Sequence, residues 1–213
     1  MLMSEMKFAL KHPKQALVYA LLGDTEYRHM RWSRSCLTAK DSALPFSLHA
    51  SKATDIHEHL VTLFMLTVEL NLRTVVELGT RGGESTVALL MAVKEIGGKV
   101  FSYDVDECSE AKHVIKQYGL EEYWEFTRGD DLFAKWNSPI DHLFIDTTHT
   151  YEQTSKELQR YEPFVRSGGI VTMHDSVSFP EVKQAVQDYS RLRRDIKLYE
   201  YLNNNGLFVL FKK

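Results

Sequence analysis

The feature that most constrains this chain is a regular alternation of short β-branched or apolar runs with helical segments, which begins near Thr54. Strands that are separated by single helices form right-handed βαβ units, in which the strands are parallel and helices cover both faces of the sheet. The expected strands are 74–78, 100–104, 124–127, 142–146 and 170–173, and the expected helices are 54–71, a segment after 85–86, 107–118 and 151–165.

The end of the chain has a different pattern. Two strand-like runs, 196–202 and 207–211, are joined by Asn203, Asn204, Asn205 and Gly206, residues that are typical of a hairpin turn. A hairpin must be antiparallel, which departs from most dinucleotide dehydrogenases. We therefore expect an α/β, Rossmann-like fold, with a mostly parallel seven-stranded sheet, helices on both faces and a C-terminal antiparallel hairpin.

Two helix boundaries are predicted from local residues. Asp55 is followed three residues later by Glu58, the spacing of an N-terminal capping arrangement. Gly168 and Gly169 are expected to stop the helix over 151–165, because glycine is common just past a helix end.

The first part of the chain is less regular. Residues 1–53 include one expected helix at 14–22, and Arg28, Arg31 and Arg34 would share one helical face. That face is either solvated or serves as a dimer contact or a lid over a substrate. We expect an N-terminal helical or irregular segment over 1–53, acting as a lid or oligomer contact, and one domain over 54–213.

Composition excludes several classes of protein. With 213 residues, 44% of them hydrophobic, the chain can bury a full core. A net charge of −3 without a dense basic block argues against a nucleic-acid binder. Two cysteines cannot form a disulfide framework, and no stretch approaches the roughly 20 apolar residues of a membrane span. These features predict a cytoplasmic protein without nucleic-acid or membrane partners.

The strongest local motif is the glycine-rich segment Glu77–Thr86, which lies between an expected strand and an expected helix. Glycines let the backbone turn sharply and approach a ligand, and free amides at a helix start favour an anionic group. The spacing is not G-x-G-x-x-G, so the dinucleotide fingerprint fails. The motif predicts a nucleotide-like ligand; the alternative is an ordinary tight turn.

Acidic residues follow the next two strands. Asp104 lies where a carboxylate can accept hydrogen bonds from ribose hydroxyls, and Asp106 competes for this role. Asp130 and Asp131 follow the third strand on the same sheet edge, where an adenine amino group would be a suitable partner. Each of these acids also fits an exposed loop.

A second polar cluster is expected beyond the fourth and fifth strands. Asp146 and His149 follow one strand, and His174 and Asp175 follow the other. Because these strand ends converge, they can supply a general base and a metal site. Two alternatives remain open: His149 is an ordinary loop histidine, and strand alternation points His174 and Asp175 to opposite faces.

Together these motifs resemble the class I S-adenosylmethionine-dependent methyltransferases, and within them the small-molecule O-methyltransferases of the catechol and macrolide-sugar types. The resemblance covers roughly residues 54–213. The stretches that carry it are Glu77–Gly83, Asp104, Gly129–Asp130, Phe144–Tyr151 and Ser167–Asp175.

The resemblance implies a role for each matching position. His149 occupies the place of the catalytic base, Asp104 that of the ribose acid, and Ser85 that of a hydroxyl that binds the cofactor carboxylate. His174 stands where the family has an acid, which puts metal dependence in question. The predicted cofactor-binding residues are Glu77, Gly79, Thr80, Arg81, Gly83, Ser85, Asp104, Asp130, Asp131 and Asp146, and the predicted metal ligands are Asp146, His174 and Asp175.

The predicted function is O-methylation of a small hydroxylated molecule such as a sugar, phenol or polyketide. S-adenosylmethionine is the expected cofactor, with a divalent cation, magnesium or a transition metal, as a second one. A neutral His149 would take the hydroxyl proton near pH 7. Apolar surface in residues 1–50 could pair two copies into a homodimer, and the sequence leaves the oligomeric state open. The alternatives are a non-catalytic cofactor-binding or scaffold protein and a nucleotide-dependent oxidoreductase.

Overall fold

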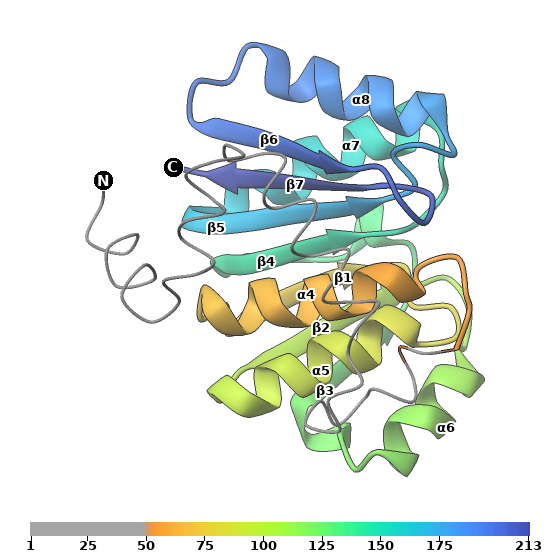
Figure 1. Ribbon diagram of the computed structural model, residues 1–213. Coiled ribbons are helices and arrows are strands. Elements are labelled where there is room, and N and C mark those ends of the chain that lie inside the picture. The colour runs from red at the N-terminus through yellow and green to blue at the C-terminus, as the bar shows by residue number, and fades with distance from the viewer. Residues whose placement is uncertain (1–49, 51) are drawn as a thin grey trace, which may run out of the picture. The chain divides into compact units, whose positions relative to one another are not determined.

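The computed structural model describes residue 50 and residues 52–213 (Figure 1). The helix expected at 14–22 and the arginine face at 28–34 lie outside the described residues. Among the described residues, no helix is both long and apolar enough to cross a membrane.

A seven-stranded sheet forms the centre of the fold, with strand order β3-β2-β1-β4-β5-β7-β6. The first five strands in the sequence pair in parallel, whereas β7 is antiparallel to both β5 and β6. The predicted fold class is therefore confirmed. The strands are β1 (Thr74–Leu78), β2 (Lys99–Asp104), β3 (Trp124–Arg128), β4 (Ile140–Ile145), β5 (Val165–His174), β6 (Ile196–Tyr201) and β7 (Leu207–Lys212).

Helices cover both faces of the sheet. In Figure 1, α4 and α5 lie in front of the sheet, while α7 lies behind it and packs against α8. The described helices are α4 (His57–Glu69), α5 (Glu84–Ile96), α6 (Ser109–Gln117), α7 (Tyr151–Tyr161) and α8 (Pro180–Arg191), with short 3-10 turns η1 (Glu121–Tyr123), η2 (Asp131–Phe133) and η3 (Glu162–Phe164).

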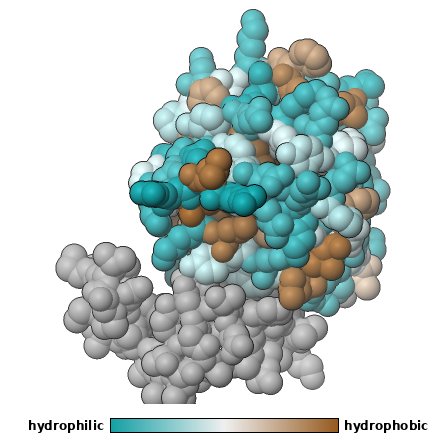
Figure 2. All heavy atoms as spheres, turned by 90° about the horizontal axis from the view of Figure 1, so that it is seen from above, coloured by the Kyte–Doolittle hydropathy of each residue, from teal (hydrophilic) through white to brown (hydrophobic). Residues whose placement is uncertain are grey.

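The core explains the apolar runs of the sequence. Because helices cover both faces, the central strands β1 and β4 are buried on both sides, and Leu78 and Leu143 are completely buried. On the α7 side, Leu158 and Tyr161 of α7 and Val186 of α8 pack against these strands. Seen from the α8 side, the surface is mostly hydrophilic, with hydrophobic side chains in separate small groups (Figure 2).

The predicted end of the helix over 151–165 was wrong. Helix α7 ends at Tyr161 and is followed by η3, and Val165 already begins β5. Gly168 and Gly169 lie inside β5, where the pairing with β4 shifts register. A Cβ on Gly169 would lie 2.8 Å from the carbonyl oxygen of Asp141, so this glycine permits a close strand approach instead of stopping a helix.

The predicted capping arrangement was also wrong. The residue that precedes α4 is Ile56, which makes no side-chain cap. Asp55 instead forms a bidentate ion pair with Arg81, with both oxygen–nitrogen distances at 2.6 Å, and Glu58 accepts a hydrogen bond from Asn203 in the hairpin loop. Both carboxylates therefore bind residues of other segments and do not cap the helix.

Helix α8 was missed in the sequence. Pro180 stands in its first turn, and Val182, Ala185 and Val186 form its buried stripe. The signal was present, since proline in the first turn with apolar residues three and four apart is typical of an amphipathic helix.

Candidate active site

A cleft of about 340 Å³ opens at the carboxyl edge of β1, β2 and β4, which is the edge where open α/β sheets bind ligands. Of the predicted site residues, those that line it are Gly79, Thr80, Arg81, Ser85, Asp104, Asp130, Asp131, Asp146 and His149. Glu77, Gly83, His174 and Asp175 are not among the lining residues. Sequence reasoning gave no role to Ile56, Thr147, Thr148 and Gln153, which also line the cleft. Thr147 and Thr148 lie within the stretch Phe144–Tyr151, whereas Ile56 and Gln153 belong to no motif.

The glycine-rich loop is pressed against the end of β4. Gly79 has a φ of +88°, and a Cβ there would lie 2.0 Å from the carbonyl oxygen of Asp146. The amide of Gly79 donates to the Tyr103 carbonyl, and the amide of Asp146 donates to the Leu78 carbonyl, at 2.9 and 2.8 Å. Gly83, at φ +90°, faces Ala111 of α6, where a Cβ would come within 2.8 Å.

Glu77 stabilises this loop from the interior of the protein. Its buried carboxylate accepts hydrogen bonds from the hydroxyls of Ser85, Thr86 and Ser102 at 2.6–2.9 Å. Burial raises the pKa of Glu77 to about 7, although the three hydroxyls favour the charged form. The Ser85 hydroxyl therefore donates its proton to Glu77. While this hydrogen bond is intact, Ser85 can offer a ligand only its hydroxyl oxygen, as an acceptor, and its backbone.

Asp104 holds the same loop from the β2 side. One carboxylate oxygen accepts from the amides of Thr80 and Arg81, at 2.8 and 3.0 Å, and the other accepts from the amide of Asp106 at 2.9 Å. Although burial opposes it, these donors lower the pKa of Asp104. A carboxylate has further acceptor positions, so Asp104 can still bind a ligand hydroxyl. Asp106 contributes its backbone, and its side chain is not among the cleft-lining groups.

The far end of the cleft is formed by the segment after β3. Asp130 caps η2 by accepting from the Leu132 amide at 2.9 Å, while Asp131 is only 8% exposed.

Near the glycine loop, the hydroxyl of Thr80 is buried without a hydrogen-bond partner among the described residues. A buried hydroxyl of this kind favours a polar ligand in the cleft.

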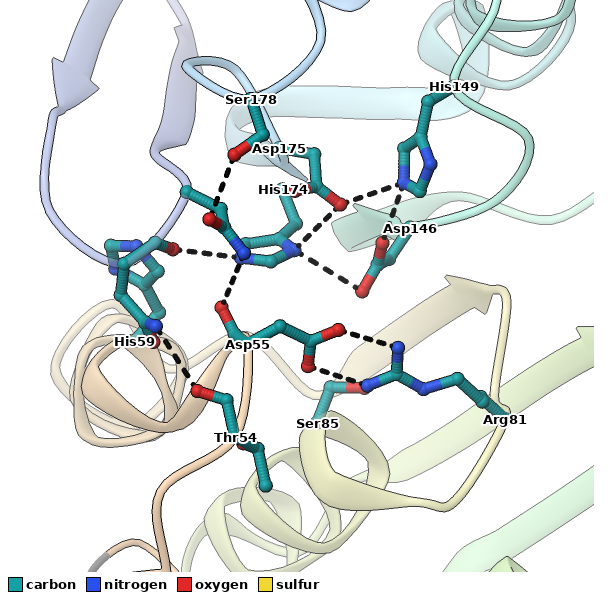
Figure 3. Close-up of polar contacts among 12 residues, drawn as sticks. Thr54, Asp55, His59, Arg81, Ser85, Asp146, His149, His174, Asp175 and Ser178 are labelled. Carbon is teal, nitrogen blue, oxygen red and sulfur yellow. Dashed lines mark hydrogen bonds and ion pairs between the residues drawn. The ribbon is translucent and has the colours of Figure 1, made fainter.

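At the other end, four side chains meet (Figure 3). His149 Nε2 lies 2.8 Å from Asp175 Oδ2 and 3.3 Å from Asp146 Oδ1, and His174 Nδ1 lies 3.3 Å from Asp175 Oδ2 and 3.6 Å from Asp146 Oδ2. His174 and Asp175 thus do not diverge. Asp175 has a left-handed φ of 64°, which breaks the strand alternation and turns its side chain into the cluster.

The geometry brings together three side chains that could hold a metal ion, and this group differs in one member from the predicted ligands. Ligand atoms of Asp146, His149 and Asp175 all lie within 4.8 Å of one another. His174 is almost completely buried behind them, with Nε2 at 3.1 Å from the Asn204 carbonyl in the hairpin loop. In this candidate group His149 stands where His174 was expected.

Electrostatics of the cluster change the expected state of His149. Its hydrogen bonds to Asp146 and Asp175 raise its pKa to about 9, and the same carboxylates raise the pKa of His174 to about 10 against the effect of burial. The two carboxylates therefore favour the protonated form of both imidazoles. This effect opposes the neutral His149 that the sequence-based hypothesis requires near pH 7.

One contact of His149 had no signal in the sequence. The ring of Phe179 stacks on the imidazole, with ring centroids 4.1 Å apart and planes at 19°. Phe179 lies just before α8, 30 residues from His149, so only the packing of α8 brings the two rings together.

Residues 76–176 match a family model described as a methyltransferase domain. The chain contains a methyltransferase domain. The predicted enzyme class is confirmed, and the matched segment begins within β1, includes Asp146, His149, His174 and Asp175, and ends just beyond β5.

Solved structures with the same fold agree with this assignment. An O-methyltransferase from Bacillus cereus in complex with SAH superposes with a TM-score of 0.67 at 16% identity, covering 87% of the methyltransferase described here and 100% of its own chain. A methyltransferase from Geobacter sulfurreducens gives 0.62 at 19% identity, covering 72% and 77%. The O-methyltransferase TomG from Streptomyces achromogenes, involved in tomaymycin synthesis and bound to SAM, gives 0.59 at 15%, covering 94% and 96%. At these identities the likeness establishes the class I fold.

Proposed function

We propose that this methyltransferase transfers the methyl group of S-adenosylmethionine to an oxygen of a small hydroxylated molecule. The observation that carries the proposal is one continuous cleft with two chemically different ends. Asp104, Asp130 and Asp131 offer acceptors for a nucleoside at one end, and Asp146 and His149 offer acid–base groups at the other. The SAH-bound and SAM-bound structures of the same fold support the choice of cofactor.

The chain's own residues fit the cofactor in three places. Asp104 has acceptor positions for ribose hydroxyls, Asp130 or Asp131 can accept from an adenine amino group, and the loop from Gly79 to Arg81 lies where the methionine part would lie. When bound, the cofactor supplies an electrophilic methyl carbon on a positively charged sulfur. The task of the protein is to hold the acceptor oxygen in line with that carbon.

Activation of the acceptor falls to the cluster at the end of β4 and β5. His149 can act as a general base only in its neutral form, and a further positive charge that balances Asp146 and Asp175, or a higher pH, would favour that form. Two carboxylates and one imidazole also fit a divalent cation, with manganese, iron, nickel or zinc suited somewhat better than magnesium. In one arrangement His149 is the base, and in the other it is a metal ligand.

The experiment is a turnover assay against a panel of hydroxylated molecules, combined with calorimetry of S-adenosylhomocysteine binding. His149→Ala should lower turnover by roughly 10²- to 10⁴-fold and leave cofactor affinity unchanged. His113→Ala, which replaces an exposed histidine of α6, is the matched control and should change neither. Full turnover in His149→Ala would remove the assigned role.

The alternative functions predict different outcomes of the same experiment. A non-catalytic cofactor-binding protein would bind S-adenosylhomocysteine without turnover of any acceptor. An oxidoreductase would bind NADH in place of it. Homodimer formation, cytoplasmic location and the role of residues 1–53 as lid or oligomer contact stay predictions.

A further inference from the structure

Two carboxyl groups lie side by side beneath the nucleoside end of the cleft. Asp131 of η2 is 8% exposed, and Glu157 of α7 is completely buried. One oxygen of Glu157 accepts from the Thr147 hydroxyl at 2.5 Å and from the Gln153 amide at 2.8 Å. The same Gln153 amide lies 3.5 Å from one oxygen of Asp131. Glu157 thus contacts two residues that line the cleft and shares one of them with Asp131.

The second oxygen of each carboxyl group has no hydrogen-bond partner among the described residues. These atoms are Asp131 Oδ2 and Glu157 Oε2, and both are buried. The two carboxyl groups lie on the same Gln153 amide, and each acts on the pKa of the other. Burial and the charge of Asp131 raise the pKa of Glu157 well above its usual range, although Thr147 favours its charged form. One proton between the two groups would satisfy both oxygens and leave a single negative charge.

We propose that Glu157 is a positioning residue of the cofactor cleft, which carries the shared proton, donates to Asp131 and holds that carboxylate as the acceptor for an N–H group of the ligand. The ligand group with this chemistry is the exocyclic amino group of a purine nucleoside. The inference rests on the proposed function, since it assigns Asp131 to the nucleoside end of an S-adenosylmethionine cleft.

Loss of the shared proton should weaken recognition of that amino group. Ionised Glu157 cannot donate, and a second negative charge would then face Asp131 in a buried site. The other titratable groups that face the pair are Asp130 beside η2, Arg160 on α7 and Tyr161, whose hydroxyl donates to the Asp131 carbonyl. Burial raises the pKa of Tyr161, so it keeps its proton at the pH values used below.

The test compares two probes, S-adenosylhomocysteine and its analogue with hydrogen in place of the 6-amino group, by calorimetry on the full chain at about pH 6.5 and about pH 9.0. At the lower pH the wild type should prefer the amino compound by about 10- to 100-fold, as expected for one hydrogen bond to a charged group. At the higher pH this preference should fall by about 3- to 10-fold, because Glu157 loses its proton as the pH rises.

Glu157→Gln separates the proposed role from a merely structural one. Its amide oxygen can still accept from Thr147 and Gln153, and its NH₂ group can donate to Asp131 at every pH. This variant should keep the wild-type preference at both pH values, whereas Glu157→Leu should lose most of it. Glu152→Gln, at an exposed acid of the same helix, is the control and should behave as the wild type does.

Three results would overturn the inference. The first is a folded Glu157→Leu protein with the wild-type preference. The second is a wild-type preference for the amino compound that changes with pH no more than the preference of Glu157→Gln does. This comparison can be made even if Glu157→Leu fails to fold. The third is a wild type that binds neither probe, which would overturn the proposed function itself and is distinguished by the absence of any binding.

Discussion

Replacing Gly79 by alanine tests whether the glycine-rich loop is shaped by its contact with the end of β4. The added Cβ would lie 2.0 Å from the Asp146 carbonyl oxygen, whereas ordinary contacts begin near 3.4 Å. Neither side can easily retreat, because Gly79 is hydrogen-bonded to Tyr103 and Asp146 to Leu78. The loop or the end of β4 must therefore shift by roughly 1 Å or more, a displacement typical of an overpacked core.

The expected cost has two parts. A left-handed residue with a Cβ costs about 1–2 kcal/mol, and overpacking adds about 1–3 kcal/mol, so Gly79→Ala should lower the free energy of unfolding by about 2–5 kcal/mol. Gly97→Ala is the matched control, because Gly97 also has a left-handed φ, of 71°, but its Cβ would meet nothing within 4 Å. The control should show only the backbone part, about 1–2 kcal/mol.

Urea unfolding of both variants measures the difference directly, and the entropy effect of glycine replacement on the unfolded chain cancels between them. Because Asp146 lines the cleft, Gly79→Ala should also weaken S-adenosylhomocysteine binding, while Gly97→Ala should not. A Gly79→Ala protein no less stable than Gly97→Ala would refute the contact between the loop and β4. Unchanged cofactor affinity would refute the role of that contact in the site.

Three further predictions concern the cofactor, the metal and the core. Asp104→Ala should weaken S-adenosylhomocysteine binding by about 1.5–3 kcal/mol in calorimetry, and Asp106→Ala should leave it unchanged. If a cation activates the acceptor, EDTA should abolish turnover but not cofactor binding, and Asp146→Asn should have the same effect. Full activity in EDTA, with no metal found by elemental analysis, would refute a role for a metal in turnover. Burial lowers the pKa of His142 from 6.5 to about 3, so below about pH 6.5 the unfolded chain takes up a proton at this histidine while the folded protein does not. Protonation therefore favours the unfolded state, and the free energy of unfolding falls as the pH falls. Between pH 7 and pH 5.5 the wild type should lose about 1 kcal/mol more than His142→Gln in urea unfolding, and equal losses would contradict this.

Part of the site could be predicted because it depends on the order of elements along the chain. The alternation of strands and helices determines a parallel sheet, and a parallel sheet places every strand end on one edge. Asp104, the last residue of β2, and Asp131, just beyond the end of β3, therefore line the same cleft, as expected. The hairpin was predictable for the same reason, since Asn203 to Gly206 specify a turn between two neighbouring strands.

Other features depend on contacts between residues far apart in the sequence, which no local pattern encodes. Gly169 resembles a helix stop, but it fits close to Asp141 in a neighbouring strand. Asp55 resembles a helix cap, but Arg81, 26 residues away, binds it more strongly as a charged partner.

The charge states of the site were likewise decided by tertiary structure. A pKa depends on burial and on the charges within a few ångströms, and both are set only when distant segments pack together. His149 was expected to be neutral, yet Asp175 from the neighbouring strand favours its protonated form. Glu157 belonged to no motif, and only the packing of α7 beneath the cleft places its carboxyl group against Asp131. The sequence alone determined which residues reach the edge of the sheet, and the packing around that edge determined their ionisation.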